Sequence, residues 1–245
     1  MGSRRGFRIM GKRRSIEDEA LPGEEEFVVL VDESVDPRVV AYHDPQSPAA
    51  EQFRAFRTSL LATLGSTDPR ILTVTSALEK EGKTITTANL GVVLADLAET
   101  KVCLVDADLR CPTLGSVYSL PEKAGLADYL VDGADLSEAI SSVCLGTLDV
   151  LPAGTEPRRA IDLLGSDRFH DLLRELRSRY QFVLIDTPPT SLFSDSIVVG
   201  GASDGTLLVT RLRFTPRSVV NQTVQQIRQA GGRVIGAFLV GADAQ

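Results

Sequence analysis

The sequence predicts a doubly wound α/β fold with a mostly parallel sheet. Short apolar runs of strand length alternate with segments of helical periodicity. The runs are continuously apolar, as in strands that are buried on both faces, and two of them end abruptly in aspartate, at residues 106 and 186. The expected strands cover residues 71–74, 102–105, 148–151, 182–185, 206–209 and 234–240.

Helical patterns lie before and between these runs. The first expected helix, residues 48–64, places five apolar side chains on one stripe at about 100° per residue: Phe53, Phe56, Leu60, Leu61 and Leu64. A second helix is expected from residue 83 to about 97. The last helix is expected to begin with Thr215 as N-cap and Pro216 in the first turn, and to stop at Gly231.

Length and composition indicate one soluble globular domain with a tail. The chain has 245 residues, of which 43% are hydrophobic and 24% are charged. Residues 1–43 contain a basic block and then an acidic block, and we expect a charged, flexible tail there and a folded domain over residues 44–245. Contact of the basic block with anionic lipid is the alternative, which the adjoining acidic residues weaken.

The charge balance and the cysteines limit the classes of partner and compartment. A net charge of -7 and a pI near 5.0 argue against a protein that holds nucleic acid by general electrostatics. The three cysteines, Cys103, Cys111 and Cys144, lack metal-ligand spacing, and no apolar run is long enough to cross a bilayer. We therefore expect a cytoplasmic protein that binds neither nucleic acid nor zinc.

The strongest local signal is the segment Ala-Leu-Glu-Lys-Glu-Gly-Lys-Thr at residues 77–84, which follows an expected strand and opens an expected helix. This context is that of a P-loop, in which backbone N–H groups and a helix N-terminus surround a phosphate. Lys83 would add charge for the β- and γ-phosphates, and the Thr84 hydroxyl would ligate Mg²⁺. The alternative for an isolated Gly-Lys-Thr is an ordinary capped helix start. The expected nucleotide-binding residues are Glu79, Lys80, Glu81, Gly82, Lys83, Thr84 and Ile85.

Two further expected strands end in carboxylates. One is followed by Asp106 and Asp108, and the other by Asp186. Because parallel strands end on the same edge of a sheet, these side chains and Lys83 are expected to meet there. The predicted metal ligands are Thr84, Asp106 and Asp186, and either Asp106 or Asp108 would orient or deprotonate the attacking hydroxyl or water. The sequence therefore predicts a site for ATP and Mg²⁺.

These segments resemble the cytoplasmic ATPase domain of the bacterial tyrosine kinases of capsule and exopolysaccharide assembly. The resemblance covers about residues 44–240 and includes the P-loop, Asp-Ala-Asp-Leu-Arg at 106–110 and Leu-Ile-Asp-Thr-Pro-Pro at 184–189. It implies a P-loop NTPase fold of the deviant Walker A type and a tyrosine kinase activity. It also implies a homo-oligomer through Glu51, Arg54 and Arg57, and recruitment to the inner face of the membrane by a membrane-embedded polysaccharide co-polymerase or activator.

Three positions depart from related patterns. Leu78 stands where the partitioning and division-site ATPases carry a signature lysine, and Glu79 and Lys80 stand where the kinases usually have proline and glycine. The sequence also ends without the tyrosine cluster of the kinases, because its only tyrosines are Tyr42, Tyr118, Tyr129 and Tyr180. There are therefore two alternatives to a kinase: a nucleotide-switched assembly ATPase that phosphorylates nothing, and a scaffold that binds no nucleotide.

Overall fold

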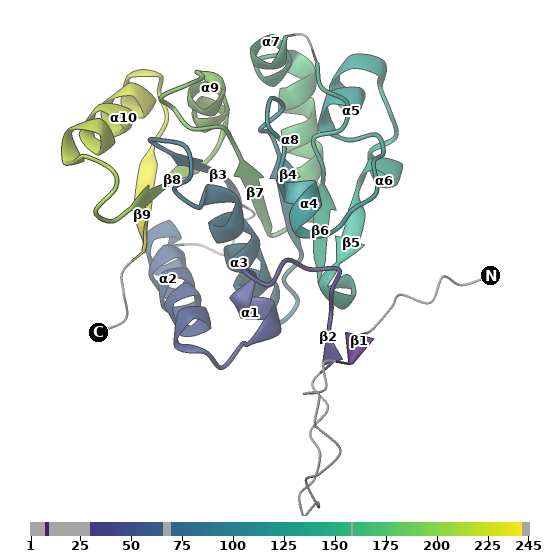
Figure 1. Cartoon of the computed structure of the whole chain (residues 1–245). Helices are drawn as coiled ribbons and strands as arrows, with labels where there is room; N and C mark the ends of the chain where they lie inside the picture. The colour runs from purple at the N-terminus through teal and green to yellow at the C-terminus, as the bar shows by residue number, and fades with distance from the viewer. Residues whose placement is uncertain (1–7, 10–29, 66–69, 158, 242–245) are drawn as a thin grey trace, which may run out of the picture.

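A seven-stranded sheet forms the centre of the molecule, in a computed structural model that describes residues 8–9, 30–65, 70–157 and 159–241 (Figure 1). The strand order is β5-β6-β4-β7-β3-β8-β9, and every neighbouring pair is parallel except β5 and β6. The strands are β3 (Arg70–Ser76), β4 (Val102–Asp106), β5 (Ser141–Val143), β6 (Leu148–Leu151), β7 (Phe182–Asp186), β8 (Gly205–Arg211) and β9 (Val234–Val240). The prediction of a mostly parallel α/β sheet is confirmed, and the antiparallel edge strand β5 was not predicted.

Helices cover both faces of this sheet. One face carries α1 (Val40–His43), α2 (Pro48–Leu64), α3 (Lys83–Ala95) and α4 (Leu114–Val117). The other face carries α5 (Leu126–Asp132), α7 (Ala160–Leu164), α8 (Asp167–Arg179) and α9 (Asp195–Ala202), with α10 (Arg217–Gln229) beside α9. The remaining short elements are α6 (Leu136–Ala139), the 3₁₀ turn η1 (Cys144–Gly146) and the ribbon of β1 (Arg8–Ile9) with β2 (Leu30–Val31).

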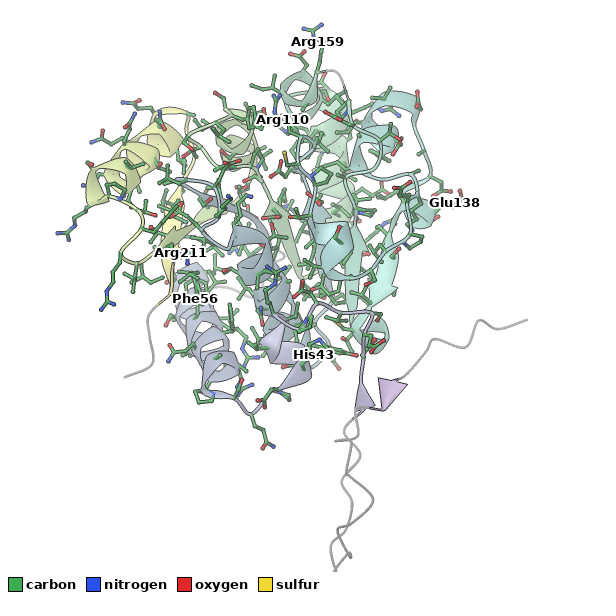
Figure 2. The ribbon with its side chains drawn as sticks, in the orientation of Figure 1. His43, Phe56, Arg110, Glu138, Arg159 and Arg211 are labelled. Atoms are coloured by element: carbon green, nitrogen blue, oxygen red, sulfur yellow. The ribbon has the colours of Figure 1, made fainter. Side chains whose placement is uncertain are left out.

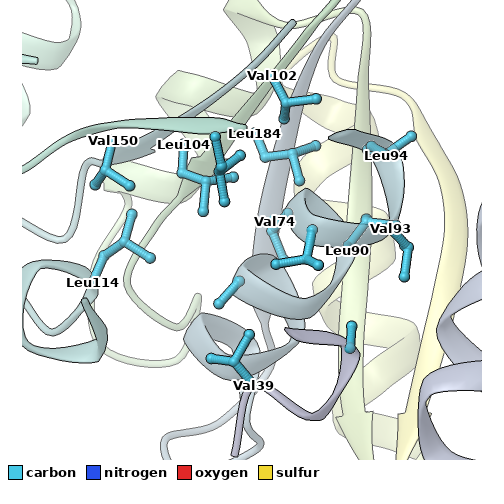
Figure 3. Packing of buried hydrophobic residues seen from close by; sticks show 14 of the residues in the cluster. Val39, Val74, Leu90, Val93, Leu94, Val102, Leu104, Leu114, Val150 and Leu184 are labelled. Atoms are coloured by element: carbon cyan, nitrogen blue, oxygen red, sulfur yellow. The ribbon is translucent and has the colours of Figure 1, made fainter. Parts of the chain in front are cut away.

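The central strands are buried on both faces, which explains why their sequences are continuously apolar. In β4, Val102 and Leu104 belong to the core on the α3 side, whereas Cys103 and Val105 belong to the core on the α8 side. Figure 3 shows Val102, Leu104 and Leu184 packed with residues of α3. Because successive side chains of a strand point to opposite faces, one strand supplies both cores.

The helix boundaries follow local capping chemistry. Residues 48–64 form α2 as predicted: the Ser47 hydroxyl accepts a hydrogen bond from the Ala50 N–H, and Gly65 ends the helix with a positive φ of 69°. The prediction that Thr215 caps the last helix is wrong. Pro216 occupies the cap position of α10, and the Thr215 hydroxyl instead donates to the carboxylate of Glu81.

The packed core extends to the N-terminal side of Asp44, where the domain was predicted to begin. Val35, Val39 and Ala41 are buried in the core on the α3 side. Most of the predicted tail, residues 1–7 and 10–29, lies outside the described residues. The segment 35–41 is held by Asn89 of α3, whose side chain accepts a hydrogen bond from the Ala41 N–H at 2.9 Å and donates one to the Arg38 carbonyl at 3.0 Å.

We expect Asn89→Ala to lower the free energy of unfolding by about 2–4 kcal/mol, because a buried side chain with three hydrogen bonds is lost and the Ala41 N–H keeps no partner. Asn221→Ala, at an exposed position of α10, is the matched control and should change it by less than about 0.5 kcal/mol. Urea denaturation measures both. Equal effects of the two substitutions would contradict the anchoring role of Asn89.

Candidate nucleotide-binding site

The ends of three parallel strands lie side by side at the centre of the sheet. Asp186, at the end of β7, pairs with Val74 of β3 on one side and with Asp106 of β4 on the other. The loop that leaves β3 leads directly into α3, and the start of α3 contacts Asp186, beside which Asp106 lies in the register of the sheet. The predicted meeting of the loop after β3 with Asp106 and Asp186 is present in the structure.

The loop between β3 and α3, together with the start of α3, lines one side of a cavity of 310 Å³. Gly82 is the N-cap of α3 with a left-handed φ of 87°, a conformation that glycine adopts without strain. Lys80 also has a positive φ, of 61°, at the position where the resemblance leads us to expect glycine. The loop therefore keeps its turn despite the bulkier residue. Five of the seven predicted nucleotide-binding residues line the cavity: Lys80, Gly82, Lys83, Thr84 and Ile85.

The other two predicted residues, Glu79 and Glu81, have different surroundings. Glu79 is exposed. Glu81 is buried, and its carboxylate accepts hydrogen bonds from the Leu78 N–H at 2.5 Å, from the Arg211 N–H at 3.0 Å and from the Thr215 hydroxyl. Its side chain thus fastens the loop to the end of β8 and to the segment before α10, and does not reach into the cavity.

The charged and hydroxyl side chains of the site contact one another directly. The Lys83 ammonium lies 3.5 Å from the Asp108 carboxylate, and the Thr84 hydroxyl donates to the Asp186 carboxylate at 2.6 Å. The two oxygens of Asp106 accept backbone N–H bonds, from Asp108 at 3.1 Å and from Leu114 at 2.9 Å. Lys83, Thr84, Asp106, Asp108 and Asp186 therefore belong to one cluster.

Two carboxylates of this cluster, Asp106 and Asp186, are destabilised in their charged form. Burial raises the pKa of Asp106, and the neighbouring charge of Asp186 raises it further. Burial also raises the pKa of Asp186, against the lowering effects of Lys83 and the Thr84 hydroxyl. Adjacent buried carboxylates create a demand for positive charge that Lys83 meets only in part.

The donor atoms fit a hard cation accompanied by phosphate. Thr84 and Asp186 supply a hydroxyl and a carboxylate, the oxygen ligands that Mg²⁺ prefers. Over the described ranges, no group of three or more His, Cys, Asp or Glu side chains forms a metal cluster. The residues thus fit Mg²⁺ held by few protein oxygens together with phosphate, and they do not form an all-protein cage.

Some features of the site were not predicted. Arg110, which is labelled in Figure 2, pairs with the fully buried Asp195 at the start of α9, with its Nε 2.8 Å from the carboxylate. Its guanidinium also lies over the Phe193 ring, 4.1 Å from the centroid. Thr113 shares a hydrogen bond of 3.1 Å with Thr84. The local sequence does not predict these contacts, because the two partners are 85 positions apart in the first pair and 29 positions apart in the second.

A second cavity, of 710 Å³, lies on the Asp106 side of α4. Its walls include Asp106, Ser116 and the loop at 152–155 that follows β6. This loop is fixed to α5, since the Pro152 and Ala153 carbonyls accept the N–H groups of Leu126 and Ala127. Ser116 lines both cavities, so they adjoin.

The residues predicted to form an oligomer interface lie on α2. Arg54 pairs with Glu51 at 2.8 Å, and Arg57 donates to the Val93 carbonyl of α3. Phe56, which is labelled in Figure 2, packs edge-on against Phe238 of β9, with ring centroids 5.1 Å apart. Both arginines therefore have partners within the chain, and the interface role of Glu51, Arg54 and Arg57 stays a prediction.

Comparison with known proteins decides the family. Residues 71–233 match the model of the family described as AAA domain. The putative tyrosine-protein kinase CapB of Staphylococcus aureus is 31% identical over 198 residues, which cover 80% of this chain and 86% of CapB. The chain is an AAA domain protein of the bacterial tyrosine kinase family. The family predicted from the P-loop and the aspartate segments is confirmed.

Other members of the bacterial tyrosine kinase family are similar in sequence and fold. The tyrosine-protein kinase Etk of Escherichia coli K12 is 34% identical over 202 residues, and this chain spans only 28% of its length. The solved kinase domain of Etk superposes with a TM-score of 0.80 at 33% identity, over 84% of this chain and 81% of that domain. The septum site-determining protein MinD of Pyrococcus horikoshii, solved with Mg-ADP, has a TM-score of 0.60 at 26% identity, over 70% of each chain. The fold is therefore that of P-loop NTPases, as predicted.

None of the helices in the described ranges is long and apolar enough to span a membrane. The three cysteines are all free thiols, and only Cys111 is exposed.

We expect Glu81→Gln to lower the free energy of unfolding by about 2–3 kcal/mol, because a buried charged acceptor of three hydrogen bonds becomes neutral. Glu79→Gln is the matched control, since it removes the same charge two residues away at an exposed position, and its effect should stay below about 0.5 kcal/mol. Chemical denaturation of the two variants checks this. A larger loss for Glu79→Gln would refute the assignment.

We expect Asp106→Asn to raise the melting temperature of the ligand-free protein by about 2–4 °C, a net gain of about 1 kcal/mol, because relief of the burial and of the repulsion by Asp186 outweighs the loss of one of the two backbone N–H bonds that the carboxylate accepts. Asp108→Asn removes the partner of Lys83 and should give no increase. Differential scanning calorimetry without nucleotide or metal measures both. A melting temperature below wild type for Asp106→Asn would show that repulsion does not dominate at this site.

Proposed function

We propose that this chain binds ATP with Mg²⁺ and transfers the γ-phosphoryl group to a tyrosine hydroxyl. The observation that carries the proposal is the single cluster formed by Lys83, Thr84, Asp106, Asp108 and Asp186 beside the cavity of the loop. Phosphoryl transfer requires positioning and charge neutralisation more than covalent chemistry, and this cluster offers both. The names of its relatives, tyrosine-protein kinases, support the same reaction class.

Each residue has a role that its contacts allow. Lys83, oriented by Asp108, stabilises negative charge on the β- and γ-phosphates. The Thr84 hydroxyl holds the cation, and Asp186 orients that hydroxyl through the 2.6 Å hydrogen bond. Mg²⁺, when bound, supplies neutralising charge between the phosphates. The N–H groups at the start of α3 bind phosphate oxygens.

The acceptor hydroxyl is assigned to the second cavity. Asp106 lines that cavity, whereas Asp108 is engaged with Lys83 and with the Cys111 N–H. Asp106 would therefore accept the phenol proton as the phenolic oxygen bonds to the γ-phosphorus and the bond to the ADP oxygen breaks. A carboxylate whose pKa is raised by burial is a stronger base than a solvated one, which suits this role.

The acceptor tyrosine is proposed to lie outside the four tyrosines of this domain. Tyr42 donates to Asp32, Tyr180 donates to Asp149, and the buried Tyr118 donates to the Ala88 carbonyl. The Arg168 guanidinium lies over the Tyr129 ring, 5.8 Å from its centroid. No tyrosine lines either cavity beside the cluster. The phosphoryl group would therefore go to a tyrosine of another polypeptide segment.

The partners follow from the family in the same proposal. A membrane-embedded polysaccharide co-polymerase or activator would recruit the chain to the inner face of the membrane. Copies of the chain would associate through Glu51, Arg54 and Arg57 on α2. Arg54 is only partly exposed and Glu51 is largely exposed, so this ion pair can be exchanged for one with a second copy.

Incubation with labelled ATP, Mg²⁺ and a glutamate–tyrosine copolymer tests the reaction. We expect phosphotyrosine on the copolymer, and a loss of at least about 100-fold with Lys83→Met, because charge stabilisation of the transferred group is removed. Lys101→Met, which removes an exposed lysine before β4 at the opposite edge of the sheet, should keep the activity. ATP hydrolysis without phosphotyrosine would instead support the assembly ATPase, and absence of nucleotide binding would support the scaffold.

A further inference from the structure

One wall of the P-loop cavity comes from a segment far from the P-loop in sequence. Residues 32–39 precede α1 and lie outside the region that the AAA domain family model matches. The Asp36 N–H donates to the Val117 carbonyl at 2.7 Å, and Val35 and Val39 are buried on either side. The segment is therefore fixed against the core, next to α4, and it contributes Asp36 and Arg38 to the cavity.

Cationic side chains outnumber carboxylates in the lining of the cavity, although the protein as a whole is acidic. The lining includes three cationic residues, Arg38, Lys80 and Lys83, and one carboxylate, Asp36, whereas the whole chain has a net charge of -7. A hollow lined by one sign of charge concentrates ligands of the opposite sign. The charge pattern thus fits a polyanion, which requires more cations than Lys83 alone.

The geometry of Arg38 suits phosphate. Its guanidinium meets both oxygens of Asp36, with Nε to Oδ1 at 2.9 Å and Nη2 to Oδ2 at 2.7 Å. The side chain is 70% exposed, so this pair contributes little to stability and its carboxylate is readily replaced. The planar guanidinium that donates two parallel hydrogen bonds to a carboxylate can donate the same two to a phosphate.

We propose that Arg38 is a further binding residue for the polyphosphate of the nucleotide, delivered to the P-loop cavity by residues 32–39. In the bound state its guanidinium exchanges Asp36 for phosphate oxygens. Asp36 holds the guanidinium in place in the free protein and competes with the ligand. This inference rests on the proposed function, because it takes the nucleotide to occupy the cavity beside Lys83.

Calorimetric titration with a non-hydrolysable ATP analogue and Mg²⁺, and separately with adenosine, tests the assignment. We expect Arg38→Ala to weaken binding of the analogue by about 10- to 100-fold, as for loss of charge-assisted hydrogen bonds, and to leave adenosine binding unchanged. Arg38→Lys should recover part of the loss, because the charge returns without the planar guanidinium. Arg174→Ala is the matched control: Arg174 is similarly exposed and also pairs with a nearby carboxylate, that of Asp171, but it lies on α8.

A second variant separates binding from a merely structural role of the segment. Asp36→Asn removes the competing charge, so it should tighten binding of the analogue by a few fold, opposite in sign to Arg38→Ala. If residues 32–39 only wall the cavity, both substitutions weaken binding together, and the proposal is overturned. It is also overturned if Arg38→Ala matches Arg174→Ala while wild type binds. If wild-type protein binds no analogue, the proposed function fails and this inference fails with it.

Discussion

The parallel register of β4, β7 and β3 is the constraint on which the site depends. It places Asp106 directly opposite Asp186, and Asp186 opposite Val74, so that two buried carboxylates face the loop that opens α3. Burial and mutual repulsion disfavour their charged forms. Lys83 and the Thr84 hydroxyl offset part of this repulsion and loss of solvation, and a bound cation with phosphate would offset the rest. The two buried carboxylates therefore lower the stability of the ligand-free protein, and they suit the site for a charged ligand.

The rest of the molecule holds this cluster in place from several directions. Glu81 fastens the loop to the end of β8, Asn89 fastens the stretch before α2 to α3, and Asp195 holds Arg110 just beyond the aspartates. Each anchor is buried and hydrogen-bonded, as polar groups in a protein interior must be. Preorganised charge of this kind lowers the cost of reorganising the site when a phosphoryl group moves. Membership in a kinase family and the contacts of these residues therefore point to the same chemistry.

Periodicity predicted the elements of the central sheet well, because strands buried on both faces leave continuous apolar runs, and α2 was predicted to the residue. The convergence of Lys83, Asp106 and Asp186 also followed from the sequence, since parallel strands end on one edge. The short antiparallel β5 and the cap of α10 were not predicted correctly, because tertiary contacts decide them: Thr215 bonds to Glu81, which lies 134 positions away. For the same reason no local pattern predicted the contacts of Arg38 or of Arg110, although Arg110 belongs to the motif at 106–110, because their surroundings exist only after folding.

The crystal structure of the chain with Mg²⁺ and a non-hydrolysable ATP analogue tests the central claim most directly. We expect the triphosphate to lie against the backbone of Gly82 and Lys83, the metal to lie at the Thr84 hydroxyl, and the Asp106 and Asp186 carboxylates to contact that metal directly or through one water. A nucleotide bound elsewhere, for instance in the cavity of 850 Å³ beside Lys101 and Arg179 at the opposite edge of the sheet, would contradict this expectation. So would a triphosphate in the loop whose metal lies away from both aspartates.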